Sequence, residues 1–448
     1  MNFATDGSGR STLSKDLRAT ARVKRRKTSI AFLPGETAGF VCALAAGFNA
    51  SGWSPEIFFL TPHPFSYESE FFSSRLWLRV AREVQDSFSR SKGPRRLILR
   101  LILAVLCTIG TVDIAVRFRV VVINNGRSFL PLSLDLLFFR MARCAVIACH
   151  CHGSPSRSAW CNCLNREDAL DPSVLKRSAK RIEREVRRST FLSSYTLGSQ
   201  TLQELVPKQN WRIEELGFPV RLPIAPSRPV GESERPLIIH IPSDPEVKGS
   251  NIIRDTIASL EGQFSFEYRE YQNLKRLEAV SIFARASLVI DQLYADRRFS
   301  VTAAECALLG TPCFTYGYAG TFSRMAPEME DVAGVLKNPE HLSADLRQFL
   351  SDQSEFMKQA SQLMLVAERF FDPERIAREL ILSMNDPPTI DFGRENAYRL
   401  GAGSSATRLT EACRLRVASD SAAAHEMHIQ VEALRLPFSR GDSPDATN

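Results

Sequence analysis

Short apolar runs alternate with longer amphipathic segments along the first half of the chain. Residues 29–33 predict a buried strand running into Pro34-Gly35, residues 37–48 a helix, and residues 57–60 a second strand. This order of strand, glycine loop, helix and strand is typical of the start of a parallel α/β domain. Further strands are predicted at 120–123, 145–148 and 190–192, and further helices at 130–141, 174–188 and 198–205.

The same alternation returns after a proline-rich stretch at residues 217–234, which we interpret as an interdomain linker. Alternation this regular predicts a doubly wound parallel sheet with right-handed crossovers. The predicted strands are 237–241, 264–267, 288–290 and 313–316, and the predicted helices are 252–260, 274–286 and 303–309.

The fold class predicted from this pattern is α/β, with two Rossmann-like doubly wound domains facing a cleft. A chain of 448 residues is too long for one hydrophobic core. We expect an N-terminal domain at 28–216 and a C-terminal domain at 235–385, joined by the linker 217–234. Residues 1–27 read as a mobile arm, and residues 386–448 as an appendage without a core of its own.

Composition and charge indicate in which cellular compartment the protein is expected. The net charge is +7, and the ten cysteines accompany a first segment that is charged and lacks the apolar centre of a secretory leader. Cysteines in such a chain fit a reducing compartment better than a disulfide framework. We therefore expect a cytoplasmic protein, at the inner face of the membrane if it meets a membrane at all.

The longest apolar run, residues 101–112, follows a basic segment at residues 90–100. The run is shorter than the roughly 20 residues that a bilayer-spanning helix needs. A buried helix of the first domain is the favoured interpretation, and an interfacial membrane helix is the alternative. We expect peripheral membrane contact at most, with the basic segment as the contact.

The first candidate site follows the predicted strand 237–241, where a loop leads to Lys248-Gly249-Ser250 at a helix start. A helix N-terminus offers unpaired N–H groups, Lys248 adds a positive charge, and Gly249 allows close backbone approach. Together these features suit a diphosphate. An ordinary loop with an exposed lysine is the alternative interpretation.

Two further polar features are expected at the same end of the second sheet. Glu305 stands among small apolar residues near a helix start, where a carboxylate can accept both hydroxyls of a ribose. A carboxylate that complements the helix dipole in the first turn is the alternative interpretation. Asp291 and Gln292 follow the predicted strand 288–290, at the edge where doubly wound sheets bind ligands.

Three motifs follow one another between His240 and Pro312: Lys248-Gly249, Ala286 to Leu293 with Asp291-Gln292, and Ser300–x4–Glu305 continuing to Gly310-Thr311-Pro312. With these motifs the stretch resembles the nucleotide-binding half of retaining glycosyltransferases of the GT-B fold, the glycogen-synthase-like group (glycosyltransferase group 1, family 4-like). The resemblance implies that Lys248 binds the donor diphosphate and Glu305 the ribose. Since protein cations would then stabilise the diphosphate, we expect no metal or cofactor. Arg297 replaces the family's first glutamate, and Ser300 replaces a glycine.

The first domain carries two weaker parts of the same resemblance. Gly35 and Gly39 resemble the family's glycine loop, which faces the donor phosphates or the acceptor. The segment His150-Cys-His152-Gly-Ser-Pro-Ser-Arg157 resembles a strand-end signature of polysaccharide-assembly transferases. This resemblance implies that His152 and Arg157 face the cleft as catalytic residues, with Arg157 suited to bidentate contact with a phosphate or carboxylate.

Two other site types are not expected. Cys149, Cys151, Cys161 and Cys163 form two C-x-C pairs, whereas structural zinc sites favour C-x2–4-C spacing because C-x-C on a strand points the thiols apart. We therefore expect no metal. The basic clusters lack interleaved aromatic residues and any recognised module, so nucleic acid is not an expected partner.

The expected function is transfer of a sugar from a nucleotide diphosphate donor to a glycan or lipid-linked acceptor, in polysaccharide or glycoconjugate assembly. Lys248 and the helix N-terminus would stabilise the departing diphosphate. We expect alanine at Lys248 or Glu305 to weaken nucleotide binding while leaving the melting temperature nearly unchanged. Two alternatives stay open: a nucleotide-sugar epimerase, and a catalytically degenerate GT-B binding or scaffold protein, which Arg297 and Ser300 favour.

Overall fold

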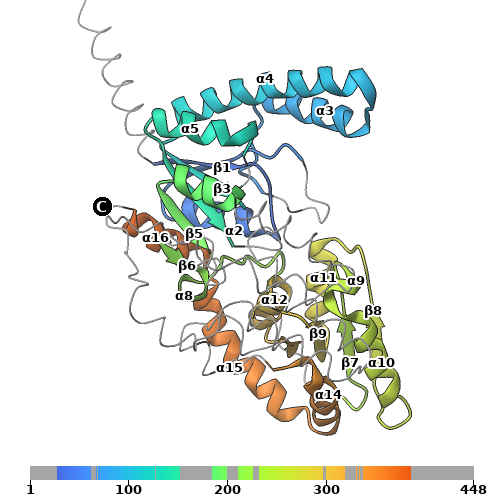
Figure 1. Cartoon of the computed structure of the whole chain (residues 1–448). Helices are drawn as coiled ribbons and strands as arrows, with labels where there is room; N and C mark the ends of the chain where they lie inside the picture. The colour runs from blue at the N-terminus through green and yellow to red at the C-terminus, as the bar shows by residue number, and fades with distance from the viewer. Residues whose placement is uncertain are drawn as a thin grey trace, which may run out of the picture.

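In a computed structural model of the chain, two separate, fully parallel sheets form the framework of the protein (Figure 1). The first has strand order β2-β1-β3-β4-β5-β6 and the second β10-β9-β7-β8. This confirms the predicted α/β class with two parallel sheets. The structure describes residues 28–61, 67, 69–126, 128–151, 184–198, 210–225, 232–295, 299–317, 329, 332 and 337–384.

The central strands of the first sheet are buried on both faces, as expected for a parallel sheet covered by helices on each side. Along β1, Ile30 and Phe32 face a core shared with α2, while Ala31 and Leu33 face a core shared with α4 and α5. The strands are β1 (Ser29–Leu33), β2 (Ser54–Ile57), β3 (Val120–Asn124), β4 (Ala145–His150), β5 (Tyr195–Gly198) and β6 (Trp211–Arg212). The helices are α2 (Phe40–Ala50), α3 (Leu76–Arg90), α4 (Gly93–Arg117), α5 (Leu134–Met141) and α8 (Ile213–Leu216), with a 3-10 turn η1 (Pro131–Ser133).

The second sheet is likewise covered on both faces. On β7, Ile238 packs with α10 and α14, whereas Ile239 packs with α11 and α12. Its strands are β7 (Leu237–His240), β8 (Glu267–Glu270), β9 (Leu288–Gln292) and β10 (Cys313–Thr315). The helical segments are α9 (Pro245–Lys248), α10 (Ser250–Leu260), α11 (Arg276–Phe283), α12 (Val301–Leu309), η5 (Pro339–His341), α14 (Leu342–Ser351), α15 (Ser354–Phe370) and α16 (Pro373–Ser383).

Three predicted strands were misplaced. Residues 190–192 belong to a helical stretch at 184–192, and β5 begins only at Tyr195. The strand β2 ends at Ile57, where the predicted strand 57–60 began, although Phe58 and Phe59 are buried and the Phe58 N–H still donates to the Phe32 carbonyl oxygen. Similarly, β8 begins at the last residue of the predicted strand 264–267. Short apolar runs mark burial, which is only loosely tied to strand pairing.

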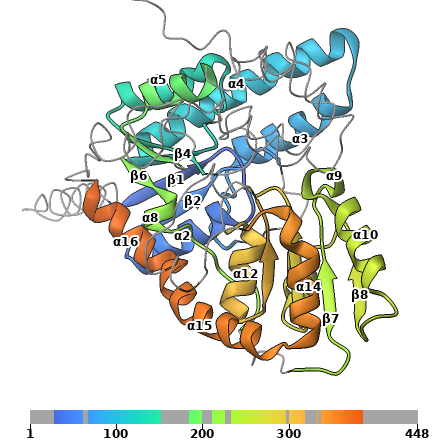
Figure 2. The same cartoon turned by 60° about the horizontal axis from the view of Figure 1, so that its bottom comes forward.

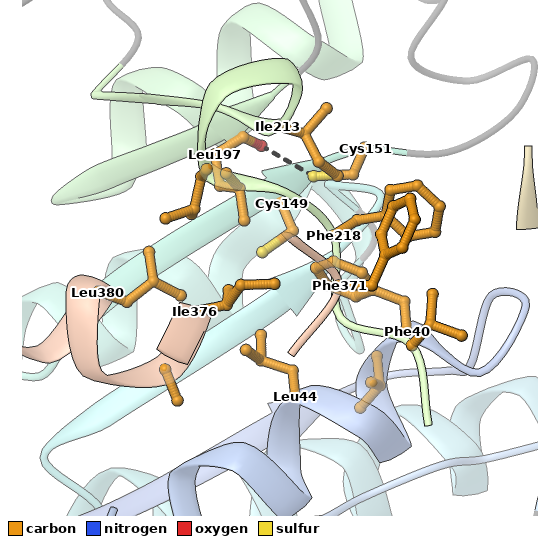
Figure 3. Packing of buried hydrophobic residues seen from close by; sticks show 14 of the residues in the cluster. Phe40, Leu44, Cys149, Cys151, Leu197, Ile213, Phe218, Phe371, Ile376 and Leu380 are labelled. Carbon is orange, nitrogen blue, oxygen red and sulfur yellow. Dashed lines mark hydrogen bonds between the residues drawn. The ribbon is translucent and has the colours of Figure 1, made fainter. Parts of the chain in front are cut away.

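The last two helices connect the two halves of the molecule. In Figures 1 and 2, α15 leaves the second sheet and α16 lies against the first, where it packs on α2. Ile376 and Leu380 of α16 share a core with Phe40 and Leu44 of α2, which Figure 3 shows from close by. Although residue 385 was the predicted end of the second domain, its final helix therefore packs on the first.

Replacing Gly47 with alanine is expected to destabilise this junction. A Cβ at Gly47 would lie 2.0 Å from the carbonyl oxygen of Pro373, at the start of α16. Overpacking of this kind costs about 1–3 kcal/mol of unfolding free energy, measurable by denaturant titration. Gly35→Ala is the control for stability, because a Cβ there meets nothing within 4 Å. Equal stability of the two variants would show that α2 and α16 separate freely.

The expectation of a buried helix at residues 101–112 was wrong. The run lies within α4, a helix of 25 residues whose outer side is exposed. Within the described residues, α4 is the one helix long and apolar enough to cross a membrane, judged by length and composition alone. Its inner side packs on α3 and α5, so the helix is an integral part of the first domain.

Candidate functional site

The loop after β7 builds the first part of the candidate site. Asp244 caps α9 by accepting a hydrogen bond from the Val247 N–H, and α9 then ends at Lys248. Gly249 follows with φ of 74°, a conformation that favours glycine, and a Cβ there would lie 3.0 Å from the Leu293 side chain. The next helix, α10, has 11 residues and no side-chain cap at its N-terminus. An uncapped helix start of this kind can bind an anion.

Lys248, which follows β7, and Asp291 of the neighbouring strand β9 form a buried ion pair. The Lys248 Nζ atom lies 3.0 Å from Asp291 Oδ1, and the side chains are 15% and 2% exposed. The predicted convergence of these two residues at one sheet edge is therefore observed. Oδ2 of Asp291 is buried and accepts no hydrogen bond from any residue that the structure describes. Such an oxygen leaves an acceptor for a ligand hydroxyl or water.

Ser250 and His240 support this loop from inside the fold. The His240 Nδ1 atom lies 2.7 Å from the Ile290 carbonyl oxygen, and Nε2 lies 2.8 Å from the Ser250 hydroxyl. Burial lowers the pKa of His240 below its usual value, so the neutral ring donates to the carbonyl and accepts from the hydroxyl. Ser250 is fully buried and thus positions the loop through His240.

Glu305 is held by Arg276. It is the fifth residue of α12, and its Oε1 atom lies 2.8 Å from Arg276 Nε, with side-chain exposures of 6% and 15%. Burial raises the pKa of Glu305, and the neighbouring Arg276 opposes that rise. The first-turn interpretation was wrong, because α12 has no acidic residue in its first turn and Ser300 caps it by accepting from the Ala303 N–H.

Arg276 also joins Glu305 to the first domain. Its Nη2 atom donates to the Arg221 carbonyl oxygen at 2.7 Å, and its guanidinium lies 5.2 Å from the centre of the Tyr67 ring. A Cβ at Gly39 would lie 2.8 Å from Tyr67 and 3.2 Å from Arg276. The structure therefore brings the predicted glycine loop next to the predicted ribose residue.

The rest of the glycine loop is closed by a local carboxylate. Glu36 accepts hydrogen bonds from the N–H groups of Thr37, Val41 and Cys42 at the start of α2. The Asn124 amide donates to the Gly35 carbonyl oxygen at 2.9 Å. The Glu36 carboxylate therefore occupies the N-terminus of α2. This helix start is less able to bind an anionic ligand than the start of α10.

The remaining predicted residues have different outcomes. Gln292 is buried within β9, while Cys149 and Cys151 are buried in the first domain core. Among the described residues, no three His, Cys, Asp or Glu side chains are grouped as metal ligands. His152, Arg157, Cys161, Cys163 and Arg297 lie outside the described residues.

The sequence interpretation missed Arg276, Tyr67 and His240 as parts of the site. Arg276 opens a helix and Tyr67 lies in a loop, and neither belongs to a motif. His240 was named as the first residue of the resembling stretch, without a role of its own. Their roles depend on contacts across the sheet and between domains, which no local pattern encodes.

Buried His150 at the end of β4 is expected to make stability depend on pH. Burial lowers its pKa from 6.5 to about 4, and its Nε2 atom lies 3.0 Å from the Ser189 hydroxyl. The unfolded chain binds a proton at His150 more readily than the folded protein does. The contribution of neutral His150 to the free energy of unfolding is therefore present above pH 6.5 and is lost as the pH falls towards 4. The loss is about 3 kcal/mol at most.

Denaturant titrations between pH 4 and 7 measure this contribution. The free energy of unfolding of His150→Asn should fall less steeply with acidification than that of the parent protein. His341→Gln, at an exposed position, serves as the control and should follow the parent. Identical slopes for all three proteins would refute the role of His150.

Comparison with known proteins finds similarity only in three dimensions. No protein-family model and no curated protein matches the sequence. A crystal structure of Anabaena Alr3699/HepE in complex with UDP and glucose has 12% identity and a TM-score of 0.47, over 80% of this chain and 99% of that one. A glycosyltransferase from Rickettsia africae has 10% identity and a TM-score of 0.46, over 79% and 96% of the two chains.

A putative UDP-N-acetylglucosamine 2-epimerase from Listeria monocytogenes is a third similar structure. It has 11% identity and a TM-score of 0.39, over 80% of this chain and 96% of that one. Identities and TM-scores this low assign neither a donor nor a reaction to the present chain.

Proposed function

We propose that the protein is a glycosyltransferase that takes its sugar from a nucleoside diphosphate donor. The observation that carries the proposal is the Lys248-Gly249 turn after β7, which leads into the uncapped N-terminus of α10. A cation, a glycine and a helix N-terminus without a side-chain cap, at the carboxyl end of a parallel strand, suit a diphosphate. The motif resemblance from His240 to Pro312 supports the same site.

Lys248 would stabilise the diphosphate as the sugar leaves. An ammonium has three donors, and one points at Asp291 Oδ1, so others remain for phosphate oxygens. Asp291 fixes the position of the ammonium before the donor arrives. Charge that develops on the leaving diphosphate is then met by a preorganised cation and helix N-terminus, which is how electrostatic catalysis works.

Glu305 would accept the ribose hydroxyls of the donor. Arg276 engages its Oε1 atom, so the proposal assigns the ribose to Oε2. Because the Glu305 side chain is only 6% exposed, Arg276 must move aside as the nucleoside enters. The site is then completed by the loop that carries Gly35 and Gly39.

The finer parts of the proposal rest on the sequence resemblance. They are a hexose donor, retention of configuration, a glycan or lipid-linked acceptor in polysaccharide or glycoconjugate assembly, and His152 and Arg157 as catalytic residues opposite the donor. The proposal also places the protein in the cytoplasm, and it requires no metal or cofactor.

A donor-turnover assay tests the proposed function. The protein is incubated with a panel of nucleoside diphosphate sugars, and release of nucleoside diphosphate and the fate of the sugar are followed. Slow release from at least one donor, lost in Lys248→Met, is the expected result. Conversion to an epimeric sugar would favour the epimerase, and binding without turnover, even with added acceptors, would favour the scaffold.

A further inference from the structure

An apolar stripe runs along the outer side of α4 for most of its length. Its members are exposed aliphatic side chains; Leu101 and Val105 are each 60% exposed and Val116 is 58% exposed. Single exposed aliphatic residues are common on protein surfaces, but a continuous row of them is not. The row consists of Ile98, Leu101, Ile102, Val105, Ile109, Val112 and Val116.

Helix geometry places this row opposite the packed side of α4. At about 100° per residue the row covers an arc of about 100°, while Cys107, Gly110 and Ile114 point the other way and are buried. A helix that is apolar all round normally lies in a protein core or in lipid. Figure 1 shows α4 in the outermost layer of the first domain, with its outer side away from the sheet.

The inner side of α4 is fastened to the domain. A Cβ at Gly110 would lie 2.4 Å from the Trp77 ring of α3. Asp113, the sole acidic residue of α4, accepts from the Trp77 indole and pairs with Arg75 and Arg117. Because these contacts hold α4 along the domain surface, the helix can meet a bilayer only lengthwise.

The charge at one end of the aliphatic row indicates which kind of surface the row contacts. Residues 87–112 contain five cations and no acidic residue. The five are exposed: Arg90, Lys92, Arg95, Arg96 and Arg100. An apolar face flanked by arginine and lysine is typical of a helix that lies in the interface of an anionic membrane.

We propose that the outer side of α4 is a docking surface for an anionic lipid bilayer. The aliphatic row enters the boundary between headgroups and acyl chains. The cations nearest the row contact lipid phosphates: Arg95 beside the row, and Arg90 and Lys92 where α3 passes into α4. The helix lies parallel to the membrane plane. This inference does not depend on glycosyl transfer, since it uses no residue of the donor site.

Vesicle co-sedimentation of the full chain tests the proposal. The protein should sediment with vesicles of phosphatidylcholine and phosphatidylglycerol, bind pure phosphatidylcholine at least tenfold less, and bind less in high salt because screening weakens the cationic contacts. The variant Leu101→Ser/Val105→Ser/Ile109→Ser should lose at least tenfold in vesicle affinity, and Val105→Asp is a milder second variant. A variant with Leu365→Ser/Leu382→Ser is the matched control, because these leucines are 68% and 73% exposed on α15 and α16.

The outcomes separate the possible occupants of the face. The control should bind vesicles within twofold of the parent, with unchanged thermal unfolding in both serine variants. Failure of the parent to bind anionic vesicles, or equal binding by the parent and the α4 variants, overturns the proposal. A dimer in light scattering that the α4 variant converts to a monomer also overturns it, because a second copy would then cover the row.

Discussion

Replacing Lys248 with methionine is expected to weaken nucleoside diphosphate binding by tenfold to more than a hundredfold. Methionine keeps most of the aliphatic stem and removes the charge that the proposal directs at the phosphates. Loss of a charge-assisted contact costs about 1.5–3 kcal/mol, which corresponds to this range in affinity. Isothermal titration calorimetry with a nucleotide that binds the parent measures the change directly.

The control for this experiment removes a lysine elsewhere in the same domain. Lys358 lies exposed on α15, and Lys358→Met changes the net charge by the same amount as Lys248→Met. Affinity of this control should equal that of the parent. If both methionine variants lose affinity equally, the general charge of the protein, rather than the loop after β7, holds the nucleotide.

Glu305→Ala is expected to lower the free energy of unfolding by about 3–5 kcal/mol, because it removes the carboxylate that pairs with the largely buried Arg276 guanidinium. Arg276 and Glu305 are 15% and 6% exposed and lie 2.8 Å apart. The sequence-based expectation was that alanine at Lys248 or Glu305 would leave the melting temperature nearly unchanged, and the observed ion pairs lead us to replace it with this prediction. Lys248→Ala is also expected to lower the free energy of unfolding, because it leaves the buried Asp291 carboxylate without its lysine.

Denaturant unfolding of a double-mutant cycle measures the contribution of the pair. Glu305→Gln keeps an acceptor for Arg276 Nε and should cost less than Glu305→Ala, while still weakening the ribose contact. The double variant Arg276→Met/Glu305→Ala should recover part of the stability lost in Glu305→Ala. If Glu305→Ala unfolds like the parent, the ion pair contributes nothing.

Local pattern was sufficient for the sheets and for one half of the candidate site. Buried strands such as β1 and β3 carry continuous apolar runs, so they were located to within one residue. Lys248 comes after β7, and Asp291 lies near the end of the neighbouring parallel strand β9. Sheet topology alone therefore predicted that the two residues converge, and the structure shows them paired.

Contacts between segments far apart in the chain could not be predicted from the sequence. Arg276 and Glu305 are 29 positions apart on different helices, and Tyr67 comes from the other domain, so no spacing rule connects them. Exposure of α4 was missed for another reason. A helix that is apolar on all sides gives the same pattern whether protein or lipid covers it, and only the packing of its neighbours separates the two.

A crystal structure with a bound nucleoside diphosphate tests the central claim most directly. The account predicts phosphate oxygens about 2.7–3.2 Å from Lys248 Nζ and from the first N–H groups of α10, with the ribose beside Glu305. A nucleotide seated elsewhere, with Lys248 still paired with Asp291 alone and Arg276 unmoved on Glu305, would contradict the proposed donor site.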